Sequence, residues 1–473
     1  MISHYAFTHY LKEYGSFAQR VSRLTSLFVF LIFLGMLGQS PVYAQTLSEK
    51  ILSMERGLEQ EFETYFGSDL AEVTQPPDEI AQTLQRVSEE TGSKSAVLWA
   101  IPRGDHLHLV LITPSGEPVV RDLYNVPNER LNQTVNDFYL EMHMPPEQMQ
   151  AARKLHDWII APFETEYLKV EEIETLLVCL GDGLRGLPLA ALHDGEQFFV
   201  EKYASTRIPA FNLIQTDYEP LDEGNVLAMG ASEFQSLNPL PAVPTELGNI
   251  LETWQFNNFS DNAISDHDSY EQVLSDHSSI HRTRAGQSFL NPEFTLANLE
   301  QQIQAQSPQV VHLATHAVFD RGNAQNSFIQ LWDSQLSLDR IQEVNWRDPS
   351  VELLVLSACR TAIGNAEAEL GFAGLTLQSG VKSALASTWN VSDTGTLALM
   401  SEFYNQLGTV TTKAEALRQA QLQMLHGEIS IEGDQLQLSR SNIELTNEWH
   451  SEEVSSLSSP YYWAAFTMVG SPW

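Results

Sequence analysis

Short, continuously apolar segments alternate with helical stretches along this chain, and this alternation constrains the fold more than any other feature. Each segment has the length of a strand that is buried on both faces. Such strands belong to largely parallel sheets with helices on both sides. The sequence therefore predicts an α/β fold. The buried-strand candidates are residues 175–180, 226–230, 309–314, 351–358 and 381–386.

The first third of the chain has a different pattern. Apolar residues recur at helical spacing over residues 46–90, and Pro76-Pro77 breaks this stretch. Residues 96–101 and 107–112 have the composition of strands joined by a turn, and residues 128–160 have a helical pattern. We expect residues 45–150 to form a helical and α/β lead-in to a larger domain.

Boundary signals mark two helices near the end of the chain. Thr412 and Glu415 form a capping box that begins a helix over residues 414–425. Asp393 is placed to cap a helix over residues 394–407. The aromatic-rich residues 461–469 are predicted to form the closing strand.

Charge excludes one class of function. The chain carries 61 acidic and 26 basic residues, which gives a formal net charge of −35. Nucleic-acid binding depends on neutralising phosphates with Lys and Arg, so a nucleic-acid partner is not expected. A hydrophobic fraction of 43% is enough to build a core. Part of the negative charge is concentrated in residues 427–460, which we interpret as an acidic surface loop.

Residues 1–44 have the pattern of a signal peptide. A polar lead with basic residues precedes an apolar run over residues 24–37, and a small-residue segment ends at Ala44. We predict cleavage after Ala44 and export of a chain that begins at Gln45. The alternative is an uncleaved membrane anchor, but a helix over the apolar run reaches about 21 Å against a hydrocarbon core of about 30 Å. No stable membrane span is expected after cleavage.

Two motifs suggest cofactors but lack the required context. Residues 181–186 match G-x-G-x-x-G, yet Leu187-Pro188 follows where a nucleotide-binding helix should begin. A turn and a short packed element are expected instead. His312 and His316 have zinc-ligand spacing, but the segment has a strand pattern, with His316 just past the end of the strand, and no third ligand is obvious. We predict neither a metal nor another cofactor, and we interpret His312 as a core histidine.

The most informative pair is His316 and Cys359. Each follows a predicted buried strand at its carboxyl end, where sites form in open α/β sheets. If the two strands are neighbours, the imidazole and the thiol project into one crevice, as a Cys–His nucleophile pair requires. The alternative is a buried structural thiol and a capping or core histidine. Cys179, the other cysteine, lies in the middle of a strand and is interpreted as a core residue.

The segments around this pair carry a more specific signal. They are GLRGLPLAAL at 183–192, VHLATHAVF at 311–319, LVLSACRTAIG at 354–364, GFAGL at 371–375, GVKSALASTWNVSD at 380–393 and YYWAAF at 461–466. Together they resemble the CHAT domain, a family related to caspases and separases. The resemblance covers about residues 150–473 and assigns residues 151–473 to this domain, with the dyad strands within 226–473.

The resemblance implies a cysteine endopeptidase with a caspase-like, largely parallel sheet flanked by helices and an N-terminal pseudo-caspase-like subdomain. Cys359 would be the nucleophile and His316 the general base and acid. An imidazole beside a thiol favours the reactive thiolate and later protonates the leaving amine. Backbone N–H groups of Cys359 and Ala317 would stabilise the oxyanion. Relatives often have Gly where Ala317 stands.

The substrate would be a protein or peptide. In caspase relatives the first specificity pocket carries a charge opposite to that of the substrate side chain. Asp320, Glu369 and Asp393 lie near predicted strand ends and are candidates to recognise Lys or Arg, although each is also explained as a helix cap or a solvated acid. The alternative function is a catalytically idle CHAT-fold scaffold or protein-interaction module.

Overall fold

A large mixed sheet organises the chain in the computed structural model. Thirteen of the strands among the described residues belong to this sheet, and most neighbouring pairs in it are parallel. The structure describes residues 45–67, 69–70, 73–221, 224–256, 285–348, 350–361, 366–445 and 456–473, with the backbone alone at 358–361 and 366–367. The predicted signal segment at residues 1–44 lies outside this part.

The strand order joins two halves of the chain. Eleven strands follow one path, and β6 (Val226–Gly230) and β7 (Gly286–Leu290) continue from β8. The path runs through β10 (Gln335–Ser337), β9 (Phe328–Gln330), β8 (Val310–Phe319), β11 (Leu353–Thr361), β12 (Ser383–Ser387), β16 (Phe466–Gly470), β5 (Ala204–Ile208), β4 (Thr175–Leu180), β1 (Ser95–Pro102), β2 (Leu107–Ile112) and β3 (Val119–Leu123).

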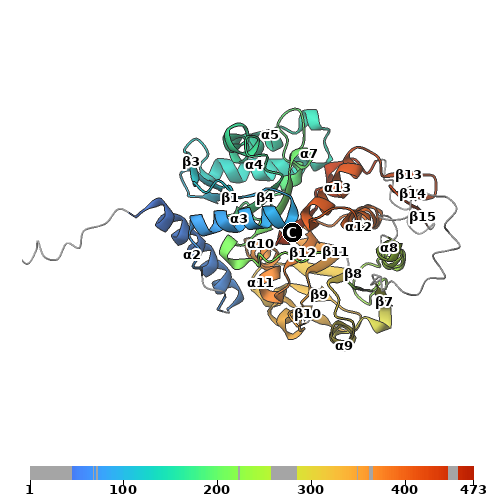
Figure 1. The fold of residues 1–473 in the computed structure, drawn as a ribbon. Coiled ribbons are helices and arrows are strands. Elements are labelled where there is room, and N and C mark those ends of the chain that lie inside the picture. Colours follow the sequence, from blue (N-terminus) through green and yellow to red (C-terminus); the bar gives the residue numbers. More distant parts are fainter. Residues whose placement is uncertain are drawn as a thin grey trace, which may run out of the picture. The chain divides into compact units, whose positions relative to one another are not determined.

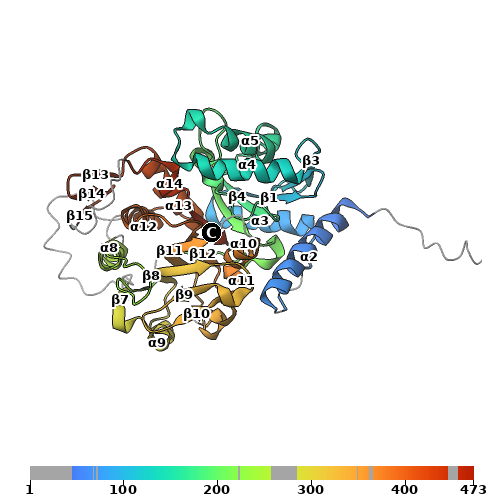
Figure 2. The same ribbon diagram turned by 180° about the vertical axis from the view of Figure 1, so that it is seen from behind.

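The predicted strands are confirmed, with β8 and β11 reaching further toward the carboxyl end than the apolar runs indicated. Helices flank the sheet. They are α2 (Leu47–Phe66), α3 (Pro77–Thr91), α4 (Asn128–Leu140), α5 (Gln150–Ile159), α7 (Phe199–Lys202), α8 (Val243–Phe256), α9 (Leu296–Gln306), α10 (Ala366–Ala373), α11 (Leu375–Ser379), α12 (Asp393–Leu407), α13 (Lys413–Leu425) and α14 (Pro460–Trp463). Figure 1 shows α4 and α5 beside β1 and β4, and α9 near β9 and β10, and Figure 2 shows the same arrangement from behind.

Burial on both faces explains the continuous apolar runs. In β11, Leu353 and Val355 join the core cluster that also contains α12 and α13. Leu354 and Leu356 alternate with them and join the cluster formed with α9, α10 and α11. Cys179 in β4 is fully buried, and its Sγ lies 3.1 Å from the Pro209 carbonyl oxygen, which confirms it as a core residue. The mixed α/β fold with helices on both faces is therefore confirmed.

The closing segment differs from the prediction in its first half. Residues 461–463 belong to the helical turn α14, and the strand β16 begins only at Phe466. Pro460 occupies the first turn of α14, where its fixed φ and missing N–H favour helix initiation. Trp463 is buried, and its indole N–H donates to the Ser458 carbonyl at 3.0 Å. The aromatic residues 461–463 therefore belong to a helical turn with a buried Trp463, and not to a longer strand.

The acidic stretch also contains more structure than the predicted loop. Its residues form a separate three-stranded sheet of β13 (Ser430–Glu432), β14 (Gln435–Gln437) and β15 (Asn442–Glu444). Leu436 and Ile443 face each other in this sheet and are buried in the main core. The loop prediction is thus wrong for residues 430–444, because a few apolar residues anchor an otherwise polar hairpin. Residues 446–455 lie outside the described residues.

Both late helices exist, but only one has the predicted cap. Thr412 Oγ1 accepts the Glu415 N–H at 3.2 Å and begins α13, as predicted. At α12 the capping side chain is Ser392, whose Oγ accepts the Gly395 N–H at 3.2 Å. Asp393 is instead the first helical residue, where a negative charge favours the helix N-terminus. The predicted role of Asp393 as the cap is therefore wrong by one position.

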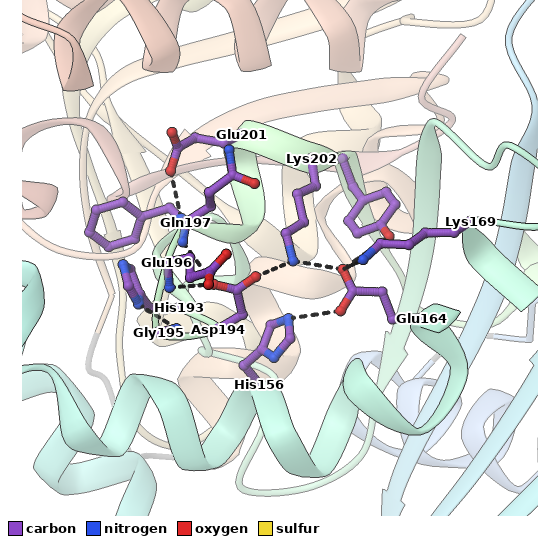
Figure 3. Close-up of polar contacts among 12 residues, drawn as sticks. His156, Glu164, Lys169, His193, Asp194, Gly195, Glu196, Gln197, Glu201 and Lys202 are labelled. Atoms are coloured by element: carbon purple, nitrogen blue, oxygen red, sulfur yellow. Dashed lines mark hydrogen bonds and ion pairs between the residues drawn. The ribbon is translucent and has the colours of Figure 1, made fainter. Parts of the chain in front are cut away.

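An ion network ties α5, α7 and the π-helical turn η3 (Glu164–Leu168) together (Figure 3). Lys202 Nζ lies 2.7 Å from Glu164 Oε1 and also contacts Asp194. His156 Nε2 lies 3.8 Å from Glu164 Oε2, and burial lowers the pKa of His156. Burial opposes ionisation of Asp194, but hydrogen bonds from Lys202 and from backbone N–H groups outweigh it and lower the pKa of Asp194. The network therefore holds charged groups in a largely buried place.

Candidate active site

The two strands that carry His316 and Cys359 are neighbours. β8 and β11 pair in parallel, and beyond a bulge between Leu356 and Ala358 the register places Ala358 opposite His316 and Cys359 opposite Ala317. Both residues lie within their strands near the carboxyl ends, whereas the sequence placed His316 just beyond the strand. The backbone of Cys359 is therefore one register position from that of His316. The side chain of Cys359 lies outside the described part of the structure.

The imidazole of His316 is held by the segment between β6 and α8. Its Nε2 lies 2.8 Å from the carbonyl oxygen of Asn238, and its ring centroid lies 4.8 Å from that of Phe234. A carbonyl oxygen only accepts hydrogen bonds, so Nε2 carries the proton and Nδ1 of the neutral ring keeps a lone pair. β6 pairs in parallel with the first part of β8, so the chain leaving β6 arrives at the end of the sheet where His316 lies.

Burial sets the protonation behaviour of His316. Removal of the ring from water lowers the pKa of His316 below its usual 6.5, and the hydrogen bond to the Asn238 carbonyl partly opposes this shift. The imidazole is therefore neutral at neutral pH. A neutral ring with its free lone pair on Nδ1 has the form required of a general base.

Of the other predicted site residues, Ala317 is buried within β8 and Asp320 is exposed just after it. Ala317 is buried, and its backbone pairs with Cys359 in β11 and with Ile329 in β9. Asp320 directly follows β8 and is exposed, and its carboxylate accepts the N–H of Arg321 at 2.7 Å. Asp320 thus lies just beyond the strand that carries His316, four residues further along the chain.

The other two carboxylates lie on helices. Asp393 is half-buried at the start of α12, with Oδ2 3.5 Å from the N–H of Ala242, in the same connection that holds His316. Glu369 in α10 is buried and interacts electrostatically with Tyr139 and Arg207. Glu369 is therefore already placed near a buried cation.

The glycine-rich loop after β4 is a packed turn, as expected. Arg207 of β5 is buried and donates to the carbonyl oxygens of Gly186, at 3.2 Å, and Leu187, at 2.6 Å. A Cβ atom at Gly186 would lie 2.7 Å from the Tyr139 hydroxyl and 2.8 Å from Glu369 Oε1, so no side chain fits there. Burial lowers the pKa of Arg207 to about 10. The apparent dinucleotide motif is thus explained by close packing around a buried arginine.

His312 lies on β8 and is buried, as interpreted from the sequence. Its Nε2 lies 3.0 Å from Glu246 Oε1 on α8, and its Nδ1 lies 3.1 Å from the Tyr404 hydroxyl on α12. Burial, and secondarily the negative charge of Glu246, raises the pKa of Tyr404 well above its usual value. The cluster joins α8 to the strand that carries His316.

Sequence reasoning missed the groups that hold His316. Asn238 contributes a backbone carbonyl, which any residue carries, so no side-chain pattern identifies it. Phe234 packs against His316, and Glu246 contacts His312 on the same strand. Both lie far from these histidines along the chain, so their contacts depend on the pairing of β6 with β8. The acidic residue in the first turn of α8 was the one available signal.

Comparisons with known proteins find one family and several solved structures that this chain resembles. The model of the CHAT domain matches residues 149–471. Two structures of the Saccharomyces cerevisiae separase–securin complex are similar to this chain, with 9% and 8% sequence identity and TM-scores of 0.41 and 0.45. Each match covers 83% of this chain and 31% of the matched chain in the complex. The chain therefore spans about a third of the length of the matched separase-complex chains.

A further similar structure is that of the Arg-specific cysteine proteinase gingipain R, with 11% identity, a TM-score of 0.38, and coverage of 72% of this chain and 69% of that chain. A complex of the pro- and mature domains of Porphyromonas gingivalis RgpB is also similar, with 13% identity and a TM-score of 0.37. This match covers 73% of this chain and 77% of the matched chain. The search of curated protein sequences finds no match.

Proposed function

Because this chain belongs to the CHAT domain family, we propose that it is a caspase-like cysteine endopeptidase in which Cys359 and His316 cleave a polypeptide substrate. One observation supports this most strongly. The parallel register of β8 and β11 places the Cys359 backbone one position from His316, whose ring has its Nε2 proton held by Asn238. This leaves Nδ1 as the proton acceptor.

The proposed reaction follows from these groups. His316 Nδ1 takes the proton from the Cys359 thiol, and the thiolate attacks the carbonyl carbon of the scissile peptide bond. Backbone N–H groups of Cys359 and Ala317 would stabilise the oxyanion. The imidazolium then gives its proton to the leaving amine as the C–N bond breaks. Water, deprotonated by the same imidazole, hydrolyses the thioester and restores the thiol.

Among the three candidate carboxylates, Asp320 is best suited to recognise a Lys or Arg side chain of the substrate. It is exposed and follows the strand of His316 directly. Asp393 contacts the segment between β6 and α8 that holds His316, so it would act near the same end of the sheet. Glu369 is buried beside Arg207, and this cation already compensates its charge. We expect Asp320→Asn to raise KM for substrates with Lys or Arg at the cleavage site.

Selective alkylation tests the proposed dyad without knowledge of the substrate. The chain has two cysteines, and burial raises the pKa of the Cys179 thiol well above its usual value. The native protein is treated with iodoacetamide at pH 7, and mass spectrometry follows each cysteine. Cys359 should react rapidly and Cys179 should not. His316→Ala should slow Cys359 by about tenfold or more, while His426→Ala, at an exposed position, should not. Equal rates in both variants would contradict the dyad.

We also propose export. The basic lead, the apolar run over residues 24–37 and the small-residue segment ending at Ala44 support a cleaved signal peptide. No helix within the described ranges is both long and apolar enough to cross a bilayer. Mass spectrometry of the protein from the cells that make it should find Gln45 at the N-terminus. An intact Met1 would contradict cleavage.

A further inference from the structure

Two histidines lie two residues apart at the start of β2, next to the terminal strand β3 of the sheet. His106 ends the turn after β1 and His108 lies in β2, so the side chains at i and i+2 share one face of the strand. β2 pairs antiparallel with β3, and the register places Asp122 directly opposite His108. Three potential ligands from the turn, β2 and β3 therefore gather on one surface.

The ligand atoms point toward one another. Asp122 Oδ1 lies 2.6 Å from His108 Nδ1 and 3.5 Å from His106 Nε2. The three ligand atoms lie within 4.8 Å of one another. The side chains of His106, His108 and Asp122 are 17%, 24% and 35% exposed, so an ion has an entry path from solvent.

A second carboxylate orients His106. Asp105 Oδ1 lies 2.7 Å from His106 Nδ1 and accepts its proton, so in the neutral ring Nε2 is the nitrogen left to bind an ion beside Asp122. The ring also packs against Tyr124, with centroids 4.7 Å apart, which further limits its rotation. Histidines that bind metals commonly donate their other ring N–H to a carboxylate in this way, and this contact fixes the tautomer.

We propose that His106, His108 and Asp122 bind a divalent transition-metal ion, with Zn²⁺ the best fit, and that this ion fastens β2 and β3 to the turn before β2. Tetrahedral zinc places its N and O ligand atoms about 3.3 Å apart, and the observed separations of 2.6 and 3.5 Å fall on either side of this spacing. Imidazole and carboxylate ligands suit zinc, whereas calcium and magnesium prefer oxygen alone.

The site is separate from the proposed dyad. In the strand order, β2 and β3 lie at the end of the sheet opposite to β9 and β10, and β11 and β8 lie toward that other end. Two neutral imidazoles and one carboxylate leave a bound ion with a net positive charge, which the chain's charge of −35 favours. The fourth position would hold water, as three protein ligands allow.

Metal titration of the full chain tests the proposal. The parent is the Cys359→Ala variant, so that the second thiol does not bind the added metal. After treatment with EDTA and dialysis, ZnCl₂ is titrated by calorimetry and CoCl₂ by visible absorption. We expect saturation at one ion per chain, a Co²⁺ spectrum typical of tetrahedral coordination, and a higher thermal unfolding midpoint in the presence of Zn²⁺.

Substitutions locate the site and define the role of Asp105. Adding His108→Ala or Asp122→Asn to the parent should weaken Zn²⁺ binding at least tenfold and remove the thermal shift. Asp105→Asn should weaken binding about 10- to 100-fold while the one-ion stoichiometry remains, because Asp105 positions a ligand. His143→Ala, at an exposed histidine elsewhere, is the control. Absence of saturable binding, or equal binding by the parent and the His108→Ala and Asp122→Asn variants, would overturn the proposal.

Discussion

The buried contact between Glu246 and His312 should contribute strongly to stability. Glu246 is 3% exposed and His312 is fully buried, and their Oε1 and Nε2 atoms lie 3.0 Å apart. Neither atom makes a hydrogen bond within the described residues, so Glu246→Ala removes a close polar contact and leaves an empty space, which should cost about 1–3 kcal/mol of the free energy of unfolding. Glu246→Gln keeps a polar group of the same shape in place and should cost less than Glu246→Ala.

Urea denaturation followed by tryptophan fluorescence measures this loss. Trp254 is a local probe because it is buried on the same helix as Glu246, and its ring centroid lies 6.1 Å from that of Tyr404. If the slope of the free energy of unfolding against urea concentration is unchanged, a change in the urea midpoint reflects a change in stability. Glu252→Ala, at an exposed position of the same helix, is the matched control and should stay within about 0.5 kcal/mol of the parent.

The outcome also bears on the candidate site. α8 follows the connection that contributes Phe234 and the Asn238 carbonyl to His316, so a loosened helix should weaken the hold on the imidazole. We therefore expect Glu246→Ala to slow alkylation of Cys359 as well. A loss below about 1 kcal/mol, or a loss equal to that of the Glu252→Ala control, would refute the reasoning.

Three further predictions concern charged or titratable groups. Lys202→Met should cost about 2–4 kcal/mol of the free energy of unfolding, because it leaves the carboxylates of Glu164 and Asp194 without the cation that they share. Lys169→Met, at a side chain that is 61% exposed, should change this free energy little in the same urea measurement. The pKa of Asp194 is lower in the folded protein than its usual 3.8, so its ionised carboxylate stabilises the fold above pH 3.8. This stabilisation should be lost as the pH falls below 3.8, and urea midpoints measured between pH 3 and 6 should detect the beginning of the loss. Phe234→Ala should expose His316, raise its pKa toward 6.5 and move the acid limb of Cys359 alkylation to higher pH; an unmoved limb would contradict burial as the cause.

Much of the sheet was predictable because burial on both faces leaves a direct record in sequence. The apolar runs of β4, β6 and β12 match their strands closely, since every residue in these strands is buried. The pairing of β8 with β11 was predicted only as a condition, because apolar runs give no information about strand order. The structure supplies that order and the register of His316 and Cys359.

Features that depend on tertiary contacts were not predictable. The helical turn of Pro460–Trp463 has strand-like composition, but Trp463 is buried and Tyr461 and Tyr462 are partly buried through packing of a turn. The acidic stretch forms a small sheet through the pairing of Leu436 with Ile443, which polar surroundings concealed. His106 and His108 were not singled out from the sequence, because their relation to Asp122 exists only through the register of β2 with β3.

The central claim is that Cys359 and His316 cleave polypeptides, and a comparison of newly formed protein N-termini tests it most directly. Proteome-wide N-terminal sequencing by mass spectrometry compares cells that make the parent chain with cells that make Cys359→Ala or His316→Ala at equal abundance. We predict a set of N-termini present with the parent and absent with both variants. The same set in the Cys359→Ala cells would contradict the account.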